Sequence, residues 1–148
     1  MSNPNEYQVG GKHYQTQYQH WDFVHDCLEG RYLEGCITKY ISRWRKKNGL
    51  QDLLKSKHYA EKLLSRIQVK DWNYVVPLCI MHTKSFPANL IRFCTDNGLT
   101  ALEVEIMGLI SNWRGAGDVE HAIFLLNQLI LPEQEMADEL AQMRQENP

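Results

Sequence analysis

Residues 32–64 read YLEGCITKYISRWRKKNGLQDLLKSKHYAEKLL and contain two amphipathic segments joined by a short turn. The first segment carries apolar side chains at steps of three and four, on one face of a helix: Leu33, Ile37, Ile41 and Trp44. Asn48-Gly49 is typical of a helix end. A second amphipathic helix is predicted from about residue 50 to residue 67. Because two such helices joined by so short a turn pack antiparallel, the sequence predicts a helical hairpin.

The remainder of the chain also favours helices. Residues 1–19 are polar and have no helical or strand period, so we expect an extended arm, followed by a short helix over residues 20–28. Residues 71–87 are apolar but interrupted by Pro77 and Pro87, and we expect a connector there. Helical patterns resume over residues 88–95, 100–113 and 118–130, and a separate amphipathic helix is predicted over residues 132–148. The expected fold is an all-α helical bundle.

Composition restricts the class of protein. A chain of 148 residues can bury one modest core, which indicates one domain or two closely packed halves. No segment approaches the roughly 18 apolar residues of a membrane span, so we expect a cytosolic protein. The four cysteines lack any CxxC spacing and no HExxH pair is present, so neither a disulfide framework nor a metal site is expected.

Charge is distributed unevenly along the chain. Up to residue 70 the sequence has 12 Lys+Arg against 7 Asp+Glu, and after it 4 against 11. The basic first half is consistent with a site for phosphates, and equally with electrostatic attraction between two halves that pack together.

An internal repeat divides the chain into two related units. Residues 33–45 (LEGCITKYISRWR) align without a gap with residues 102–114 (LEVEIMGLISNWR), and seven of the thirteen positions are identical. The helices that follow align as well, if the second turn is three residues shorter. We therefore predict two three-helix units, over residues 20–70 and 88–131, packed about a pseudo-twofold axis, with the second unit a degenerate copy.

Positions that both copies share are expected to serve the fold. Trp44, Arg45 and Asp52 all recur, and an Arg45–Asp52 ion pair is predicted to hold the hairpin turn together, with Arg114–Asp118 as its equivalent. We prefer this structural role for Arg45 to a catalytic one.

Positions that the second copy has lost are candidates for function. Lys39, Arg43 and Lys46 lie at i, i+4 and i+7, so a continuous helix would carry them on one face. Their counterparts are uncharged: Gly108, Asn112 and Gly115. Like charges at this spacing repel, and a bound polyanion would offset that repulsion. A solvated charged face is the simpler interpretation.

The first 68 residues resemble a known family. VGGKHYQ at residues 9–15, HWDF at 20–23 and the hairpin sequence together resemble the SaV-like family of small phage proteins, called phage nucleotide kinase, although Ser56 stands where the family pattern has a small Ala. The resemblance implies a phage protein of the host bacterial cytoplasm that binds nucleotides and phosphorylates (deoxy)nucleoside monophosphates. A kinase of this kind would use Mg²⁺ with a nucleoside triphosphate.

The arm supplies further candidate ligands for phosphate. Gly10-Gly11 would allow the backbone to approach a ligand closely, with Lys12 and His13 as charged or hydrogen-bonding groups and Tyr14 beside them. We expect these residues to act with Lys39, Arg43 and Lys46, while Tyr40 or Tyr59 stacks either on a base or in the core. No residue stands out as a general base, so the catalytic residues stay unassigned.

Three functions remain open on sequence grounds. The first is a nucleotide kinase, and the second is a non-catalytic nucleotide binder, for instance a counter-defence sponge for host signalling nucleotides. The third is a nucleic-acid-binding or host-protein-binding module, which the acidic second half disfavours. A homo-oligomer is also expected, because Met136, Leu140 and Met143 form an apolar stripe on the last helix.

Overall fold

The computed structural model describes residues 16–29, 31–69 and 86–147, and within them all regular secondary structure is helical. The elements are α1 (His20–Leu28), α2 (Tyr32–Arg43), the 3₁₀ helix η2 (Trp44–Lys46), α3 (Leu50–Gln68), α4 (Phe86–Asp96), α5 (Ala101–Ser111) and α6 (Ala116–Glu146). The all-α bundle expected from the sequence is confirmed. Most of the predicted arm (residues 1–15) and of the predicted connector (70–85) lies outside the described residues.

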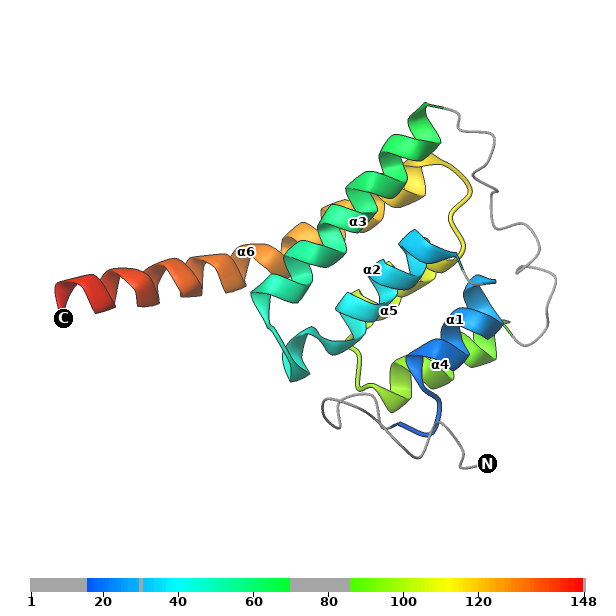
Figure 1. Cartoon of the computed structure of the whole chain (residues 1–148), viewed down its shortest axis with the longest axis horizontal. Coiled ribbons are helices and arrows are strands. Elements are labelled where there is room, and N and C mark those ends of the chain that lie inside the picture. Colours follow the sequence, from blue (N-terminus) through cyan, green and yellow to red (C-terminus); the bar gives the residue numbers. More distant parts are fainter. Residues whose placement is uncertain (1–15, 30, 70–85, 148) are drawn as a thin grey trace.

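Each helix of the first half packs against its counterpart in the second half. α1 packs against α4, α2 against α5 and α3 against α6, and Figure 1 shows these three pairs side by side. The short helices meet through Phe23 and Phe93, whose stacked rings have centroids 4.6 Å apart. In α2 and α5 the isoleucines that repeat in the sequence are fully buried: Ile37, Ile41, Ile106 and Ile110. The apolar periodicity of the repeat therefore builds the core between the two units.

Two fully buried carboxylates join the units. Trp113 of the second unit donates from Nε1 to Glu34 of the first over 2.9 Å, and Trp44 of the first donates from Nε1 to Glu103 of the second. Glu34 aligns with Glu103 and Trp44 aligns with Trp113. The units thus exchange the same hydrogen bond in both directions, as a twofold axis requires. We call these two contacts the crossed Trp–Glu pairs.

Each buried carboxylate also has a cationic partner. Arg31 binds Glu34 at 2.9 Å, whereas Arg45 reaches across from the first unit to Glu103. Burial raises the pKa of Glu103, but hydrogen bonds from Arg45, from the Thr100 backbone and from Trp44 outweigh it, so the pKa lies below its usual value. Glu103 is therefore an ionised carboxylate inside the core.

Two element boundaries differ from those predicted. We expected helices to end near residue 130 and to restart at Pro132, but α6 is one continuous helix of 31 residues with Pro132 inside it. Proline removes one hydrogen bond, to the carbonyl of Gln128, and because Pro132 is exposed, water can bind that carbonyl instead. α4 begins at Phe86 rather than residue 88, with Pro87 in its first turn, where the missing N–H costs nothing.

Among the residues that the structure describes, no helix combines the length and the hydropathy needed to cross a membrane.

The crossed Trp–Glu pairs predict a large effect of a small change. Trp44→Phe and Trp113→Phe keep most of the apolar surface but remove the N–H donor to a buried carboxylate. Each should lower the free energy of unfolding by about 1.5–3 kcal/mol, measured by urea denaturation. Phe124→Leu changes an exposed ring on α6 and should stay within about 0.5 kcal/mol of wild type. Equal losses in all three variants would contradict a specific role for the pairs.

Candidate functional site

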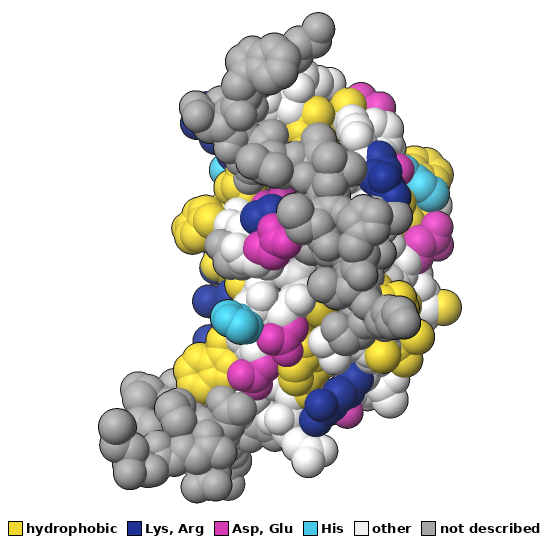
Figure 2. All heavy atoms as spheres, turned by 90° about the vertical axis from the view of Figure 1, so that its right-hand side faces the viewer, with side chains coloured by type: hydrophobic (Ala, Val, Ile, Leu, Met, Phe, Trp, Pro, Cys, Tyr) yellow, Lys and Arg dark blue, Asp and Glu magenta, His cyan; other side chains and the backbone are white. Residues whose placement is uncertain are grey.

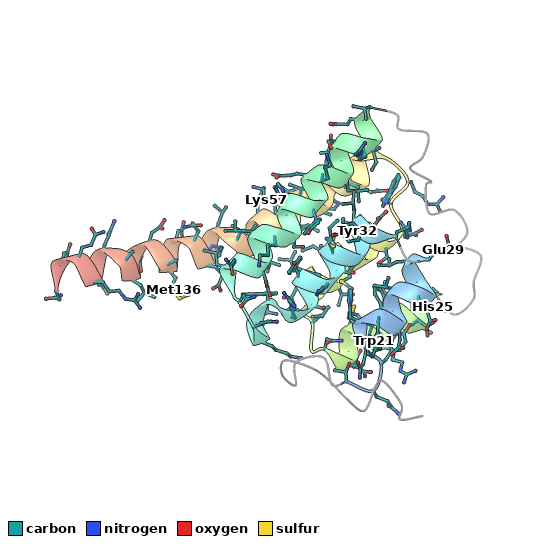
Figure 3. The ribbon with its side chains drawn as sticks, in the orientation of Figure 1. Trp21, His25, Glu29, Tyr32, Lys57 and Met136 are labelled. Carbon is teal, nitrogen blue, oxygen red and sulfur yellow. The ribbon has the colours of Figure 1, made fainter. Side chains whose placement is uncertain are left out.

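Three tyrosines from α2 and α3 form a row on the hairpin. Tyr40 and Tyr59 are stacked, with ring centroids 5.9 Å apart and planes at 16°, and Tyr32 meets Tyr59 edge to face at 6.3 Å. Tyr32 stands at the start of α2 and is 71% exposed (Figure 3), while Tyr40 and Tyr59 are half-buried. Burial raises the pKa of Tyr40, and the hydrogen bond with Tyr32 raises that of Tyr59, so both phenols stay protonated at neutral pH.

Three cations converge on the ring of Tyr40. Lys39 Nζ lies 5.9 Å from the ring centroid, Lys55 Nζ 5.6 Å and Arg43 Cζ 4.8 Å, all within cation–π range. Arg43 is neutralised by Asp52. No carboxylate of the described residues forms an ion pair with Lys39 or Lys55. We call Tyr32, Tyr40, Tyr59, Lys39 and Lys55 the tyrosine–lysine cluster, and its two ammonium groups are available to an anion.

Arg43 has a different role from the one predicted. It was expected to face a ligand, but it is only 7% exposed, and its Nε donates to Asp52 Oδ2 at 3.0 Å. Asn48 Nδ2 also donates to Asp52, at 3.1 Å. Arg43, not Arg45, therefore forms the ion pair that holds the hairpin turn. The direct contribution of Arg43 to the site is its charge close to Tyr40.

The prediction of an Arg45–Asp52 pair is wrong because the α-helical pattern ends at Arg43. Residues 44–46 form a 3₁₀ turn, in which each residue advances by about 120° rather than 100°, so Arg45 faces α5 and reaches Glu103. Its guanidinium also lies over the Trp44 ring, 4.3 Å from the centroid. In the second unit it is the backbone N–H of Arg114 that donates to Asp118, at 2.6 Å.

The same 3₁₀ turn separates Lys46 from the other predicted phosphate ligands. Lys46 Nζ donates to the backbone carbonyl of Asn97 at 3.2 Å, at the end of α4, whereas Lys39 and Arg43 lie over Tyr40. Lys12, His13 and Tyr14, the candidates in the arm, lie outside the described residues. Of the predicted set, the structure brings together Lys39 and Arg43.

His20 of α1 lies close enough to Lys39 and Arg43 for their charges to act on its imidazole. Burial, followed by the charges of Lys39 and Arg43, lowers the pKa of His20 from 6.5 to about 3. The Thr38 hydroxyl donates to the Glu34 carbonyl at 2.9 Å, so the neutral imidazole donates from Nε2 to Thr38 Oγ1 at 3.1 Å. An anion bound at Lys39 would weaken the repulsion and raise the pKa of His20. The imidazole is therefore a natural reporter of ligand binding.

The second unit has lost the cluster while keeping the fold. Counterparts of the cluster in α5 and α6 are apolar, small or only weakly basic: Ala101 for Tyr32, Gly108 for Lys39, Leu109 for Tyr40, His121 for Lys55 and Leu125 for Tyr59. His121 lies 3.8 Å from Glu105, so the equivalent place holds a carboxylate. Since the helices pack alike in both units, packing does not require the cluster.

Two members of the cluster had not been singled out from the sequence. Lys55 lies one turn after Asp52 and one turn before Tyr59, and this spacing on α3 is the signal that identifies it. Tyr32 lies two turns before Tyr40 on the same face of α2. Pairing the two helix faces across the hairpin would have found both.

Charge elsewhere on the molecule is mixed. On the face shown in Figure 2, basic, acidic and apolar side chains of the described residues are interspersed, so the basic excess of the first half forms no single patch there. Within the residues that the structure describes, no three His, Cys, Asp or Glu side chains are grouped so that they could hold a metal ion.

A family model matches part of the chain. The model of a family of proteins of unknown function, DUF3310, matches residues 8–61, a segment that contains the whole tyrosine–lysine cluster and ends before the second unit. None of the curated proteins matches the chain, and none of the solved structures does.

The corrected ion pair predicts unequal effects at two equivalent aspartates. Asp52→Asn removes the counter-charge that Asp52 gives the buried Arg43 guanidinium and should lower the free energy of unfolding by about 3–5 kcal/mol. Asp118→Asn loses a helix-end contact to a backbone N–H and should cost about 1 kcal/mol. Chemical denaturation measures both, and similar losses would contradict the assignment.

The lowered pKa of His20 predicts a pH dependence of stability. Because its folded pKa is lowered, the unfolded chain takes up a proton near pH 6.5 while the folded chain does not until about pH 3. Stability should therefore be complete above pH 6.5 and fall below it by up to about 1.4 kcal/mol per pH unit.

His20→Gln retains a donor for Thr38 without titrating, so the fall between pH 6.5 and 5 should flatten in thermal melts. The lowered pKa of Glu103 adds a loss only below its usual value of 4.5. An unchanged slope in the variant would exclude His20 as the titrating group.

Proposed function

We propose that the tyrosine–lysine cluster binds a nucleotide, with its base against the tyrosine row and its phosphates at Lys39 and Lys55. The observation that carries the proposal is the convergence on one half-buried aromatic ring of two ammonium groups that have no carboxylate partner among the described residues. Aromatic rings stack on bases, and Lys is a common partner of phosphate. The cluster is specific to the first unit, where the resemblance to the SaV-like phage nucleotide kinases also lies.

The size of the site favours a mononucleotide over a nucleic acid. Long polyanions are bound by extended basic surfaces, whereas this cluster offers two lysines, and the second half of the chain carries an excess of acidic residues. A nucleoside monophosphate, whose phosphate carries roughly two negative charges at neutral pH, matches two ammonium groups in charge. In the proposed setting, a phage protein in the host bacterial cytoplasm, either host or phage nucleotides would be ligands.

Phosphoryl transfer to a nucleoside monophosphate is the reaction that the resemblance implies. Such transfer rests on positioning and on charge stabilisation of the phosphates, which two lysines and the nearby Arg43 supply in part. Storage of the intact nucleotide is the alternative, and it needs only the binding groups. Analysis of the nucleotide after incubation with the protein separates phosphoryl transfer from storage.

Binding should be tested with a panel of deoxynucleoside mono-, di- and triphosphates and cyclic oligonucleotides, using thermal shift and then isothermal titration. The double variant Lys39→Ala/Lys55→Ala should lose at least tenfold in affinity for the ligand that stabilises wild type. Lys62→Ala removes an exposed charge from α3 outside the cluster and should bind as wild type does.

Replacement by second-unit residues tests the tyrosine row. Tyr40→Leu/Tyr59→Leu copies Leu109 and Leu125, so the variant should fold and should bind several-fold more weakly through the loss of stacking. The His20 imidazole resonance should report the ligand in wild type. No stabilisation by any nucleotide, or equal binding by the double lysine variant, would overturn the proposal.

Incubation with a nucleoside triphosphate labelled at its γ-phosphate and each monophosphate, followed by denaturation and chromatography, identifies the activity. Label in a nucleoside diphosphate shows a kinase, and intact ligand shows a binder.

A further inference from the structure

The C-terminal half of α6 extends beyond the body of the protein. Figure 1 shows it, in orange and red, projecting away from the other helices. Every residue from 135 to 147 is exposed. The stretch 132–146, which we call the tail, is about 22 Å long at the rise of an α-helix. A lone helix of this length is only marginally stable in water, so a partner would stabilise it.

One side of the tail is apolar. Met136 is 53% exposed, Leu140 50% and Met143 60% (Met136 is labelled in Figure 3). Their spacing of four and three residues places them on one face. The same face continues back along α6 through Leu125 and Leu129, which pack into the core. A helix lying against the tail would therefore extend the layer that covers α6 in the body.

We propose that this partner is the tail of a second copy of the chain, bound antiparallel. In a parallel pair the two bodies, each of which ends at residue 131, would lie against each other at the same end of the paired tails. An antiparallel partner places the two bodies at opposite ends of the paired tails. The contact is isologous, so it closes as a dimer.

Charge supports the antiparallel arrangement. The tail has five carboxylates, Glu133, Glu135, Asp138, Glu139 and Glu146, against one guanidinium, Arg144. Four of these carboxylates, Glu133, Glu135, Asp138 and Glu139, lie in the half of the tail next to the body, whereas Arg144 lies near the tip. Antiparallel pairing brings each Arg144 beside the acidic half of the other tail, and parallel pairing would set the four carboxylates against their equals. Charge complementarity therefore favours the antiparallel pair.

The oligomeric state tests the proposal directly. Sedimentation equilibrium of the full chain should give the mass of a dimer. Leu140→Glu buries a charge in the contact and should give a monomer with an unchanged melting profile of the body. Gln145→Glu adds the same charge on the opposite side of the tail and should leave the dimer intact. A monomeric wild type, or a dimeric Leu140→Glu variant, would overturn it.

Two further variants test the orientation. Arg144→Glu should weaken the dimer about tenfold, because each tip then sets a like charge against the acidic half of the other tail. Asn147→Cys places a thiol at the tip, where antiparallel tails hold the two thiols roughly a tail length apart, so mild oxidation should yield no disulfide beyond that of wild type. A tip-to-tip disulfide, or no effect of Arg144→Glu, would reject the antiparallel pairing. Nucleotide binding is measured separately, so either proposal can fail alone.

Discussion

The crossed Trp–Glu pairs are the constraint on which the rest of the structure depends. An ionised carboxylate inside a core is costly unless it is both hydrogen-bonded and charge-compensated. Glu34 takes its counter-charge from Arg31 of its own unit and a further hydrogen bond from Trp113 of the other, whereas Glu103 takes both its counter-charge, Arg45, and the Trp44 hydrogen bond from the other unit. The register of α2 against α5 is therefore fixed by polar contacts, while the isoleucines between them supply the burial.

Much of the fold was accessible from sequence because it rests on local periodicity. The helix spans and the repeat follow from apolar residues at steps of three and four. The wrong predictions, the end of the last helix and the Arg45–Asp52 pair, arose where a general rule about sequence does not hold in this structure. Pro132 usually ends a helix, yet on an exposed stretch its cost is small enough for α6 to continue. The 3₁₀ turn after Arg43 leaves the apolar stripe of the sequence unchanged. The stripe therefore could not show that Arg43, rather than Arg45, pairs with Asp52.

The candidate site was foreseen only in part, for a related reason. Comparing the two copies identified Lys39 correctly as a residue that packing does not require. It could not show that Arg43 is buried or that Lys46 turns towards α4, since both depend on where the helix ends. Lys55 belongs to the other arm of the hairpin, and its proximity to Tyr40 is a tertiary fact. The sequence of one segment shows which residues share a helix face. A site between two helices also depends on how the helices are aligned along each other, which the sequence of either segment does not show.

An exchange of identical contacts is what two identical subunits make across a twofold axis. The chain therefore has the architecture of a homodimer joined into a single polypeptide. In a true homodimer any substitution appears twice, so a change that removes a ligand group from one half removes it from the other. Joining the halves lifts that restriction. The second half keeps Glu103 and Trp113, which the first half needs. Its outer face has been free to diverge, as Gly108 and Leu109 show. The chain therefore carries one tyrosine–lysine cluster for each pair of units.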